Sequence, residues 1–188
     1  YDVALSNGNK LLSDGTLSSG NFNDNNKNKT LTARIGLLPF SNSSLELGVS
    51  GMFGKVGDEG AENQNTKAKQ YAFDLNYVKN LSPVLLNVKS QFNIKNVNQN
   101  IYTDPADTFT NHTTAFFAQC SIRPIGANGL IKNFELAGRY TSFNTPHSLS
   151  GMDQHTVTIG LDYWINWRTV LKMTYDAYKA TSTVSYTH

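Results

Sequence analysis

Hydrophobic and polar residues alternate along most of the chain, which is the pattern of extended strands with one apolar and one polar face. From Thr156 to Tyr163, the apolar residues Val157, Ile159 and Leu161 occupy every second position. The same alternation starts again at Leu171 and continues to Tyr175. Helical periodicity is nearly absent from the sequence. The pattern therefore predicts an all-β protein whose strands are connected by turns and loops.

About nine segments carry this alternation, and we expect them to form one domain over residues 1–188. The predicted strands are Tyr1 to Asn7, Thr30 to Leu38, Leu45 to Gly54, Tyr71 to Tyr77, Val84 to Ile94, Thr114 to Ile122, Phe134 to Phe143, Thr156 to Tyr163, and a last strand around Leu171 to Tyr175. The sixth segment is the least regular, because the neighbours Phe116 and Phe117 must fall on opposite faces.

The connections between the predicted strands differ in length. Long polar loops, residues 8–29, 55–69 and 95–111, follow the first, third and fifth strands, whereas short turns follow the second, fourth and eighth. In an antiparallel sheet, this order places tight turns at one end and long loops at the other. Outer-membrane β-barrels are built in this way, with short periplasmic turns and longer outside loops.

Alternation alone does not separate a membrane barrel from a soluble β-sandwich, because both have strands with one apolar face. A strand that spans a bilayer needs about 9–11 residues, and soluble strands cluster near five or six. The segments Val84 to Ile94 and Phe134 to Phe143 keep the pattern for about ten residues, which favours an antiparallel transmembrane β-barrel. Because bacterial barrels have an even number of strands, nine strands predict an incomplete portion of a larger barrel, or one strand too many.

Aromatic residues gather near the ends of the predicted strands. Barrels carry belts of Tyr and Trp at the two membrane interfaces, where the ring contacts lipid and the polar atom contacts water. The alternative is that these rings simply pair across neighbouring strands. The predicted belt residues are Tyr71, Tyr77, Phe92, Tyr140, Phe143, Tyr163, Trp164, Trp167, Tyr175 and Tyr178.

Charged residues alternate with the apolar ones inside several strands, and in a barrel they would face the water-filled lumen. The predicted lumen-facing residues are Arg34, Glu46, Asp74, Lys89, Glu135, Arg139, Asp162, Lys172 and Asp176. Charge selection in a pore needs a ring of one sign, and these charges nearly cancel. We therefore expect weak charge selectivity. The alternative is a cross-strand network that only orders the wall.

Composition and charge narrow the classes of function. Charged residues make up 16% of the 188 residues, and the formal net charge is +2, with no basic stripe of the kind that nucleic-acid binding requires. The single cysteine, Cys120, is expected to be a small apolar residue rather than a nucleophile. No run of residues approaches the roughly eighteen apolar positions of a membrane helix.

Catalytic and metal-binding motifs are absent from the sequence. There is no HExxH, GxSxG, Walker or GxGxxG pattern, and we expect neither an enzyme nor a cofactor. The four histidines lack the paired spacing of a zinc site, Asp24 lacks the further acidic ligands of a calcium loop, and two loop carboxylates lack an apolar pocket. These residues are His112, His147, His155, His188, Asp24, Asp104 and Asp107.

Four stretches together resemble the phosphate-selective porin O and P family of outer-membrane channels, most closely its Bacteroidota-type members. They are YDVALSNG, TARIGLLPFSNSSLELGVSGMFG with Arg34, Pro39 and Leu47-Gly48-Val49-Ser50, FELAGRYTSF, and TVTIGLDYWINWRTVLKMTY. The resemblance implies a barrel of about sixteen strands, of which this chain would be the later part. It also implies passive diffusion of small hydrophilic or anionic solutes across a Gram-negative outer membrane.

The partners implied by this reading are the lipid bilayer, lipopolysaccharide, the solutes themselves, and further copies or subunits of a larger outer-membrane complex. Two alternatives remain open. A non-conducting barrel would serve as an accessory or structural subunit of such a complex. A soluble β-sandwich would bind carbohydrate through Tyr and Trp on a flat surface.

Overall fold

The computed structural model describes residues 1–7, 9–11, 17, 27–61, 63–101, 108–145 and 153–180. In these ranges the chain forms nine strands and one short 3-10 helix, η1 (Ile131–Asn133). The strands are β1 (Asp2–Ser6), β2 (Thr30–Leu37), β3 (Leu45–Lys55), β4 (Lys67–Leu81), β5 (Val84–Ile101), β6 (Thr108–Arg123), β7 (Phe134–Asn144), β8 (Gln154–Asn166) and β9 (Thr169–Ala180). No helix among the described residues is long and apolar enough to cross a membrane.

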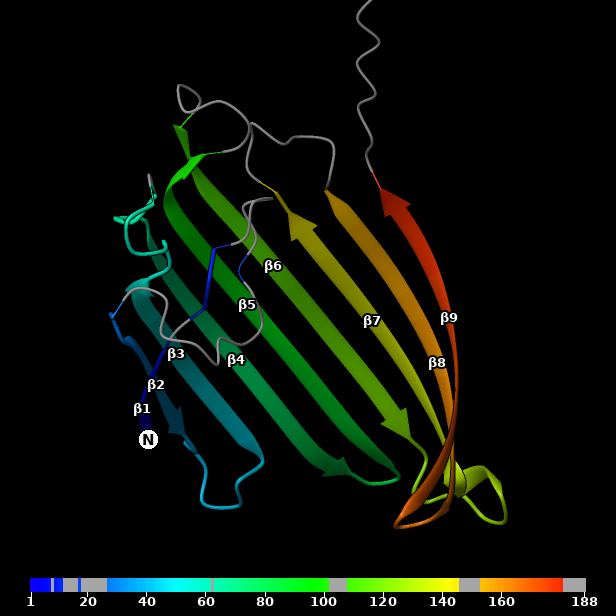
Figure 1. Cartoon of the computed structure of the whole chain (residues 1–188). Coiled ribbons are helices and arrows are strands. Elements are labelled where there is room, and N and C mark those ends of the chain that lie inside the picture. Colours follow the sequence, from blue (N-terminus) through cyan, green and yellow to red (C-terminus); the bar gives the residue numbers. More distant parts are fainter. Residues whose placement is uncertain are drawn as a thin grey trace, which may run out of the picture.

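All nine strands belong to one antiparallel sheet in which each strand pairs with the next along the chain. Figure 1 shows this meander as a single layer that bends along its width from β1 to β9. The prediction of an all-β antiparallel sheet with nine strands is confirmed. The sheet is open, with β1 at one edge and β9 at the other.

Tight turns lie at one end of the sheet, but that end also carries the longer connections of residues 38–44 and 124–133, whereas β5 and β6 at the opposite end are separated only by residues 102–107. Two-residue turns join β4 to β5 at the cis Ser82–Pro83 peptide and β8 to β9 at residues 167–168. The β3–β4 connection lies at the opposite end and spans residues 56–66. Of the predicted loop 8–29, residues 8, 12–16 and 18–26 lie outside the described part of the chain.

The predicted loops 55–69 and 95–111 are longer than the connections in the structure. Strand β4 already begins at Lys67, β5 continues to Ile101 and β6 begins at Thr108, so much of residues 95–111 belongs to strands. Asn96 on β5 pairs with His112 on β6 within this extension. Alternation ends near Ile94 because both faces become polar there, yet backbone pairing needs no apolar side chains. The sheet therefore extends beyond its apolar part.

One face of the sheet is apolar and the other is polar. The apolar face is open to its surroundings: Leu136 is 59% exposed and Ile159 is 56% exposed. Some polar-face carboxylates are less exposed, with side-chain exposed fractions of 21% for Asp74 and 11% for Asp162, although that of Lys172 is 61%. This difference is expected for a sheet that curls with its polar face inside.

The buried apolar cluster is small and lies at the long-loop end. Leu11, Val56, Ala68 and Val97 form it, and Leu17 packs against them. Two backbone bonds fix the loop segments in place: the Leu11 amide donates to the Val56 carbonyl (2.9 Å) and the Val56 amide to the Thr66 carbonyl (3.0 Å). Most of the large apolar side chains in the described strands therefore lie outside any core.

Candidate functional site

The polar face forms one continuous surface from β3 to β9. A single row of register partners crosses these seven strands, and it consists of Glu46, Asn76, Lys89, Gln119, Arg139, Thr158 and Asp176. Neighbouring partners in a sheet point to the same side. Four of the nine charged residues predicted to share a face therefore lie in one line.

The other five predicted charged residues lie on the same face. Glu135 pairs with Asp162, which pairs with Lys172. Asp74 pairs with Gly48, two residues from Glu46, and Arg34 pairs with Ser50, two residues further along β3. All nine residues thus share the polar face, and its role as the wall of a lumen stays a prediction.

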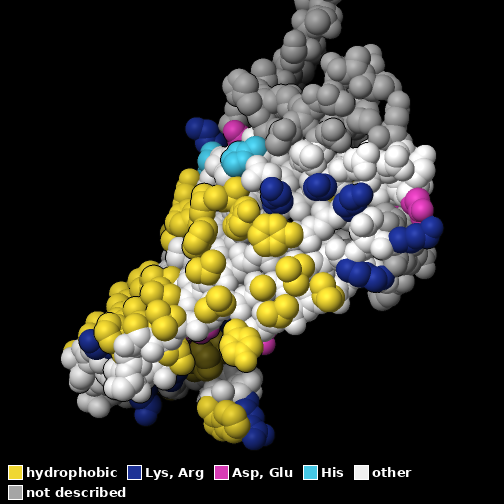
Figure 2. Space-filling model, turned by 90° about the vertical axis from the view of Figure 1, so that its left-hand side faces the viewer, with side chains coloured by type: hydrophobic (Ala, Val, Ile, Leu, Met, Phe, Trp, Pro, Cys, Tyr) yellow, Lys and Arg dark blue, Asp and Glu magenta, His cyan; other side chains and the backbone are white. Residues whose placement is uncertain are grey.

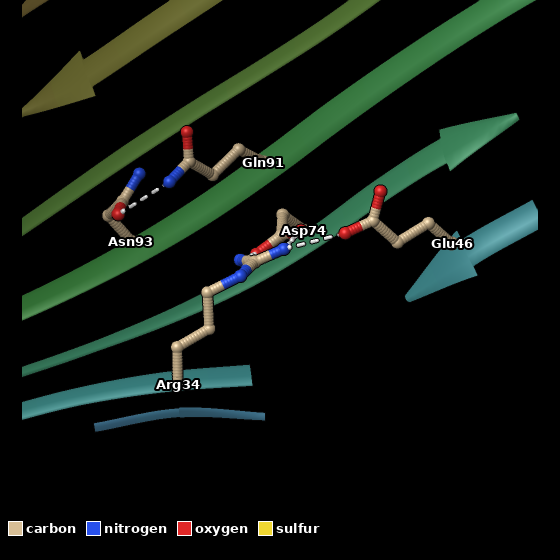
Figure 3. Close-up of polar contacts among 5 residues, drawn as sticks. All are labelled: Arg34, Glu46, Asp74, Gln91 and Asn93. Atoms are coloured by element: carbon tan, nitrogen blue, oxygen red, sulfur yellow. Dashed lines mark hydrogen bonds and ion pairs between the residues drawn. The ribbon is translucent and has the colours of Figure 1, made fainter. Parts of the chain in front are cut away.

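At the β2–β4 side, one arginine holds two carboxylates (Figure 3). The Arg34 guanidinium donates to both carboxylate oxygens of Asp74, through Nη1 to Oδ1 and through Nη2 to Oδ2 at 2.9 Å, and Nη2 also donates to Glu46 Oε1 at 3.1 Å. Fork-shaped pairing of this kind fixes orientation as well as charge. The cluster keeps a formal charge of −1.

Glycine at position 48 makes this arrangement possible. Arg34 on β2 reaches Asp74 on β4 across the intervening strand β3, and a Cβ on Gly48 would lie 2.4 Å from Asp74 Oδ1. No real Cβ is found so close to an oxygen, so any side chain at residue 48 displaces the carboxylate. Figure 3 also shows Gln91 and Asn93 on β5, where the Gln91 amide donates to Asn93 Oδ1 (3.4 Å).

A second cluster surrounds Glu135 near the short-turn end. The Trp164 indole donates to Glu135 Oε2 at 2.8 Å, and the Ser121 hydroxyl donates to Glu135 Oε1. The Arg123 guanidinium carbon lies 5.2 Å from the centre of the Trp164 ring. Next to this group, Lys172 Nζ lies 3.4 Å from Asp162 Oδ2.

Between the two clusters the face is less acidic. The Arg139 guanidinium lies over the Phe117 ring, 4.1 Å from its centre, and its Nε donates to Thr141 Oγ1 at 3.3 Å. Arg139 and Lys172 also line a shallow hollow with Gln119, Thr156 and Thr158. This part of the surface carries hydrogen-bond donors, hydrogen-bond acceptors and both signs of charge.

Three further charged residues of the polar face were missed in the sequence. Asp2 pairs with Arg34, Lys95 pairs with Gln70, and Arg123 pairs with Leu85, all polar-face positions. Counting two positions at a time from Lys89 and from Gln119 would have found Lys95 and Arg123. The polar face of the described strands thus carries six cations and six anions. The cations are Arg34, Lys89, Lys95, Arg123, Arg139 and Lys172, and the anions are Asp2, Glu46, Asp74, Glu135, Asp162 and Asp176.

The predicted aromatic belt is only partly on the apolar face. Tyr71, Tyr77, Phe92, Tyr140, Tyr163 and Tyr175 are there by register. Phe143, Trp164 and Tyr178 are on the polar face instead, and Trp167 lies in the β8–β9 turn beneath Arg168. The belt assignment was wrong for Phe143, Trp164 and Tyr178, because nearness to a strand end does not decide the side on which a residue points.

Four of the predicted rings on the apolar face, Tyr71, Phe92, Tyr140 and Tyr175, form an oblique row with Phe53 and Phe116, which the sequence analysis did not include. The row consists of Phe53, Tyr71, Phe92, Phe116, Tyr140 and Tyr175. Between β3 and β9, which are six strands apart, the row moves by eight residues along the strands relative to the paired positions. At about 3.3 Å per residue and 4.8 Å per strand, this shift corresponds to an inclination of roughly 40°. We call this row the aromatic row.

The described histidines have partners other than a metal. His112 Nδ1 lies 2.6 Å from Asn96 Oδ1, and His155 Nδ1 lies 3.2 Å from the Tyr140 hydroxyl. In the described ranges, no three His, Cys, Asp or Glu side chains gather into a group that could hold a metal. Five residues considered in the sequence analysis lie outside the described residues: His147, His188, Asp24, Asp104 and Asp107.

A comparison of the chain with protein-family models, curated proteins and solved structures finds no match. The resemblance to the phosphate-selective porin family therefore depends on the sequence motifs alone.

Proposed function

We propose that this chain forms part of the wall of an outer-membrane channel. Its apolar face contacts lipid, and its polar face lines a water-filled lumen through which small hydrophilic solutes diffuse passively. In this proposal the long-loop end faces the outside of the cell and the short-turn end faces the periplasm.

The observation that carries the proposal is an extended apolar face over which the described residues form no second layer. The described strands form one sheet, and large apolar side chains on β1 to β9 are exposed along it, among them Val3, Ile35, Val49, Phe73, Leu136, Ile159 and Met173. Figure 2 shows such side chains gathered over the side of the molecule that it presents. A carbohydrate-binding β-sandwich would cover this face with a second sheet.

The magnitude of the hydrophobic effect makes this face costly in water. Transferring one Leu, Ile, Val or Phe side chain from water to an apolar medium is favourable by about 1.5–3 kcal/mol. Soluble monomers rarely expose contiguous apolar patches larger than a few hundred Å². Acyl chains are the medium that removes this cost for all strands at once.

The aromatic row supports a membrane boundary. The row makes an angle of roughly 40° with the direction perpendicular to the strands. The strands of outer-membrane barrels tilt by a similar angle, 35–45°. When strands tilt by this angle in a bilayer, such a row lies level with the membrane surface. The amphipathic rings of Tyr71, Tyr140 and Tyr175 would then lie at the headgroup level.

The two edge strands require partners in this setting. Each unpaired backbone amide or carbonyl costs several kcal/mol in hydrocarbon, so a spanning sheet must close. We therefore propose that β1 and β9 pair with further strands, from the same polypeptide or from another subunit. The equal numbers of cations and anions on the polar face support a channel with weak charge selectivity.

Two measurements on the same preparation test this function. The protein is inserted into lipid vesicles and analysed for heat-modifiable electrophoretic migration, and it is then added to a planar bilayer under voltage. We expect migration that changes on boiling, and stepwise conductance. Insertion without conductance would favour the accessory, non-conducting barrel, and failure to insert would overturn both membrane proposals.

A further inference from the structure

The charges of the described strands are distributed unequally between the two faces. Every Asp and Glu in these strands, Asp2, Glu46, Asp74, Glu135, Asp162 and Asp176, lies on the polar face. On the apolar face, the only charged residues within these described strands are cations: Lys55, Lys67, Lys69, Lys79 and Lys179. A surface charge of one sign selects a partner of the opposite sign.

Most of these lysines lie at one end of the apolar face. Lys55 follows Phe53 by two positions on β3, Lys69 precedes Tyr71 by two positions on β4, and Lys179 follows Tyr175 by four on β9. They are thus on the long-loop side of the aromatic row. Two histidines share this region, since His112 pairs with Asn96 and His155 pairs with Lys179. In Figure 2, the His and several Lys and Arg side chains lie above the hydrophobic ones, and further Lys and Arg side chains lie at the lower end.

Three of the lysines surround one ring. Lys55 pairs with Lys67 and Phe53 pairs with Lys69 across β3 and β4, and the four residues line a shallow hollow together with Gly54 and Ala68. Lys67 and Lys69 are exposed. In the adjoining loop, Asp58 Oδ2 lies 2.9 Å from Lys10 Nζ, and Glu59 Oε1 lies 2.8 Å from Lys27 Nζ.

From this placement, and resting on the proposed function, we infer that Lys55, Lys67 and Lys69 with Phe53 form a binding site for the phosphate groups of lipid A, the anionic anchor of lipopolysaccharide. A lysine ammonium is a strong point-charge partner for phosphate. The ligand must be amphiphilic, because the site borders the apolar face directly. Acyl chains would lie along that face while the phosphates contact the lysines. The long-loop side is the outside in barrels of this type, where lipopolysaccharide resides.

Binding of purified lipid A to the full chain in detergent tests this inference. We expect the Lys67→Ala/Lys69→Ala double variant to bind lipid A roughly 30-fold more weakly, since a cation near a lipid surface contributes about 1 kcal/mol. Lys67→Arg/Lys69→Arg should retain binding. Lys79→Ala is the matched control, because Lys79 lies on the same face of the same strand at the short-turn end, and it should leave the affinity within about twofold.

Three results would overturn the site: unchanged affinity in the double alanine variant, an equal loss in Lys79→Ala, or displacement of lipid A by millimolar inorganic phosphate alone. Lipid A without its phosphates should bind no better than the double variant. Conductance of the same preparations separates this inference from the proposed function. A conducting channel without lipid A preference contradicts only the site, and a protein that never conducts contradicts the channel.

Discussion

Arg34 on β2 binds Asp74 on β4 across the strand between them, directly over the backbone of Gly48. The two residues are forty positions apart in the sequence. Their contact ties three strands together on the polar face and leaves Glu46 as a second carboxylate on the same guanidinium. The polar face is therefore an ordered network near β2–β4 and not merely a row of solvated charges.

Gly48→Ala should destabilise the sheet, because the new Cβ would lie 2.4 Å from an Asp74 carboxylate oxygen. We expect a loss of about 1–3 kcal/mol in the free energy of unfolding, the usual cost of forced displacement in a packed site. Urea unfolding of the vesicle-inserted protein measures it. Gly138→Ala is the control, since a Cβ at residue 138 meets nothing within 4 Å. Equal stability of the two variants would show that the Arg34–Asp74 contact does not depend on Gly48.

Ion selectivity should be weak and should respond to Arg34 in a defined direction. The polar face of the described strands carries equal numbers of opposite charges, and Arg34→Ala would leave Glu46 and Asp74 without this cation. We expect a reversal potential near zero for the native channel in a salt gradient, a shift towards cation preference in Arg34→Ala, and the opposite shift in Asp74→Asn. A strong anion preference that disappears in Arg34→Ala or Lys89→Ala would contradict this balance.

Arginine should be tolerated on one side of β8 and rejected on the other. Ile159 lies on the apolar face and its neighbour Thr158 on the polar face, where its hydroxyl donates to Asp176. Ile159→Arg should cost about 2–4 kcal/mol of folding free energy in vesicles, the penalty for a cation near the middle of a bilayer. Thr158→Arg should cost less than about 1 kcal/mol, because that side meets water. Similar penalties at both positions would count against a lipid-facing surface.

The two tryptophans should behave differently. Trp164→Phe removes the hydrogen bond donated to Glu135 Oε2 and should cost about 1–2 kcal/mol in urea unfolding. Trp167 is 78% exposed in a turn, and Trp167→Phe should change stability by less than about 0.5 kcal/mol. In Trp167→Phe the remaining indole fluorescence should be quenched by aqueous iodide rather than by brominated lipid. Quenching by brominated lipid would instead indicate that Trp164 lies in the membrane belt.

Residue alternation was sufficient to predict most of this fold. Because strand side chains alternate strictly, one apolar run fixes both faces of its strand, and all nine charged residues chosen in this way share the polar face. The same rule, applied strictly, would have separated Trp164 from Tyr163, since neighbours in a strand point to opposite sides. Trp164 was assigned to the wrong face because its distance from the strand end was used instead of the alternation of odd and even positions along the strand.

Other features depend on register, which a single sequence does not supply. The residues after Ile94 lose their apolar alternation, so the extension of β5 to Ile101 is visible only through its pairing with β6. The Arg34–Asp74 contact requires three strands in one alignment. The oblique line of Phe53, Tyr71 and Phe116 likewise appears only when the strand offsets are known.

The most direct test of the account asks which medium meets each side of β3. Val49 lies on the apolar face and Ser50 on the polar face, and Cys120, which is exposed, is replaced by serine beforehand. Val49→Cys and Ser50→Cys are prepared in outer-membrane vesicles. We predict that a fluorophore on the first is quenched by brominated lipid, and that the second reacts with a small water-soluble thiol reagent. Reaction of both with the aqueous reagent, or protection of Val49→Cys from lipid and water alike, would contradict the membrane channel.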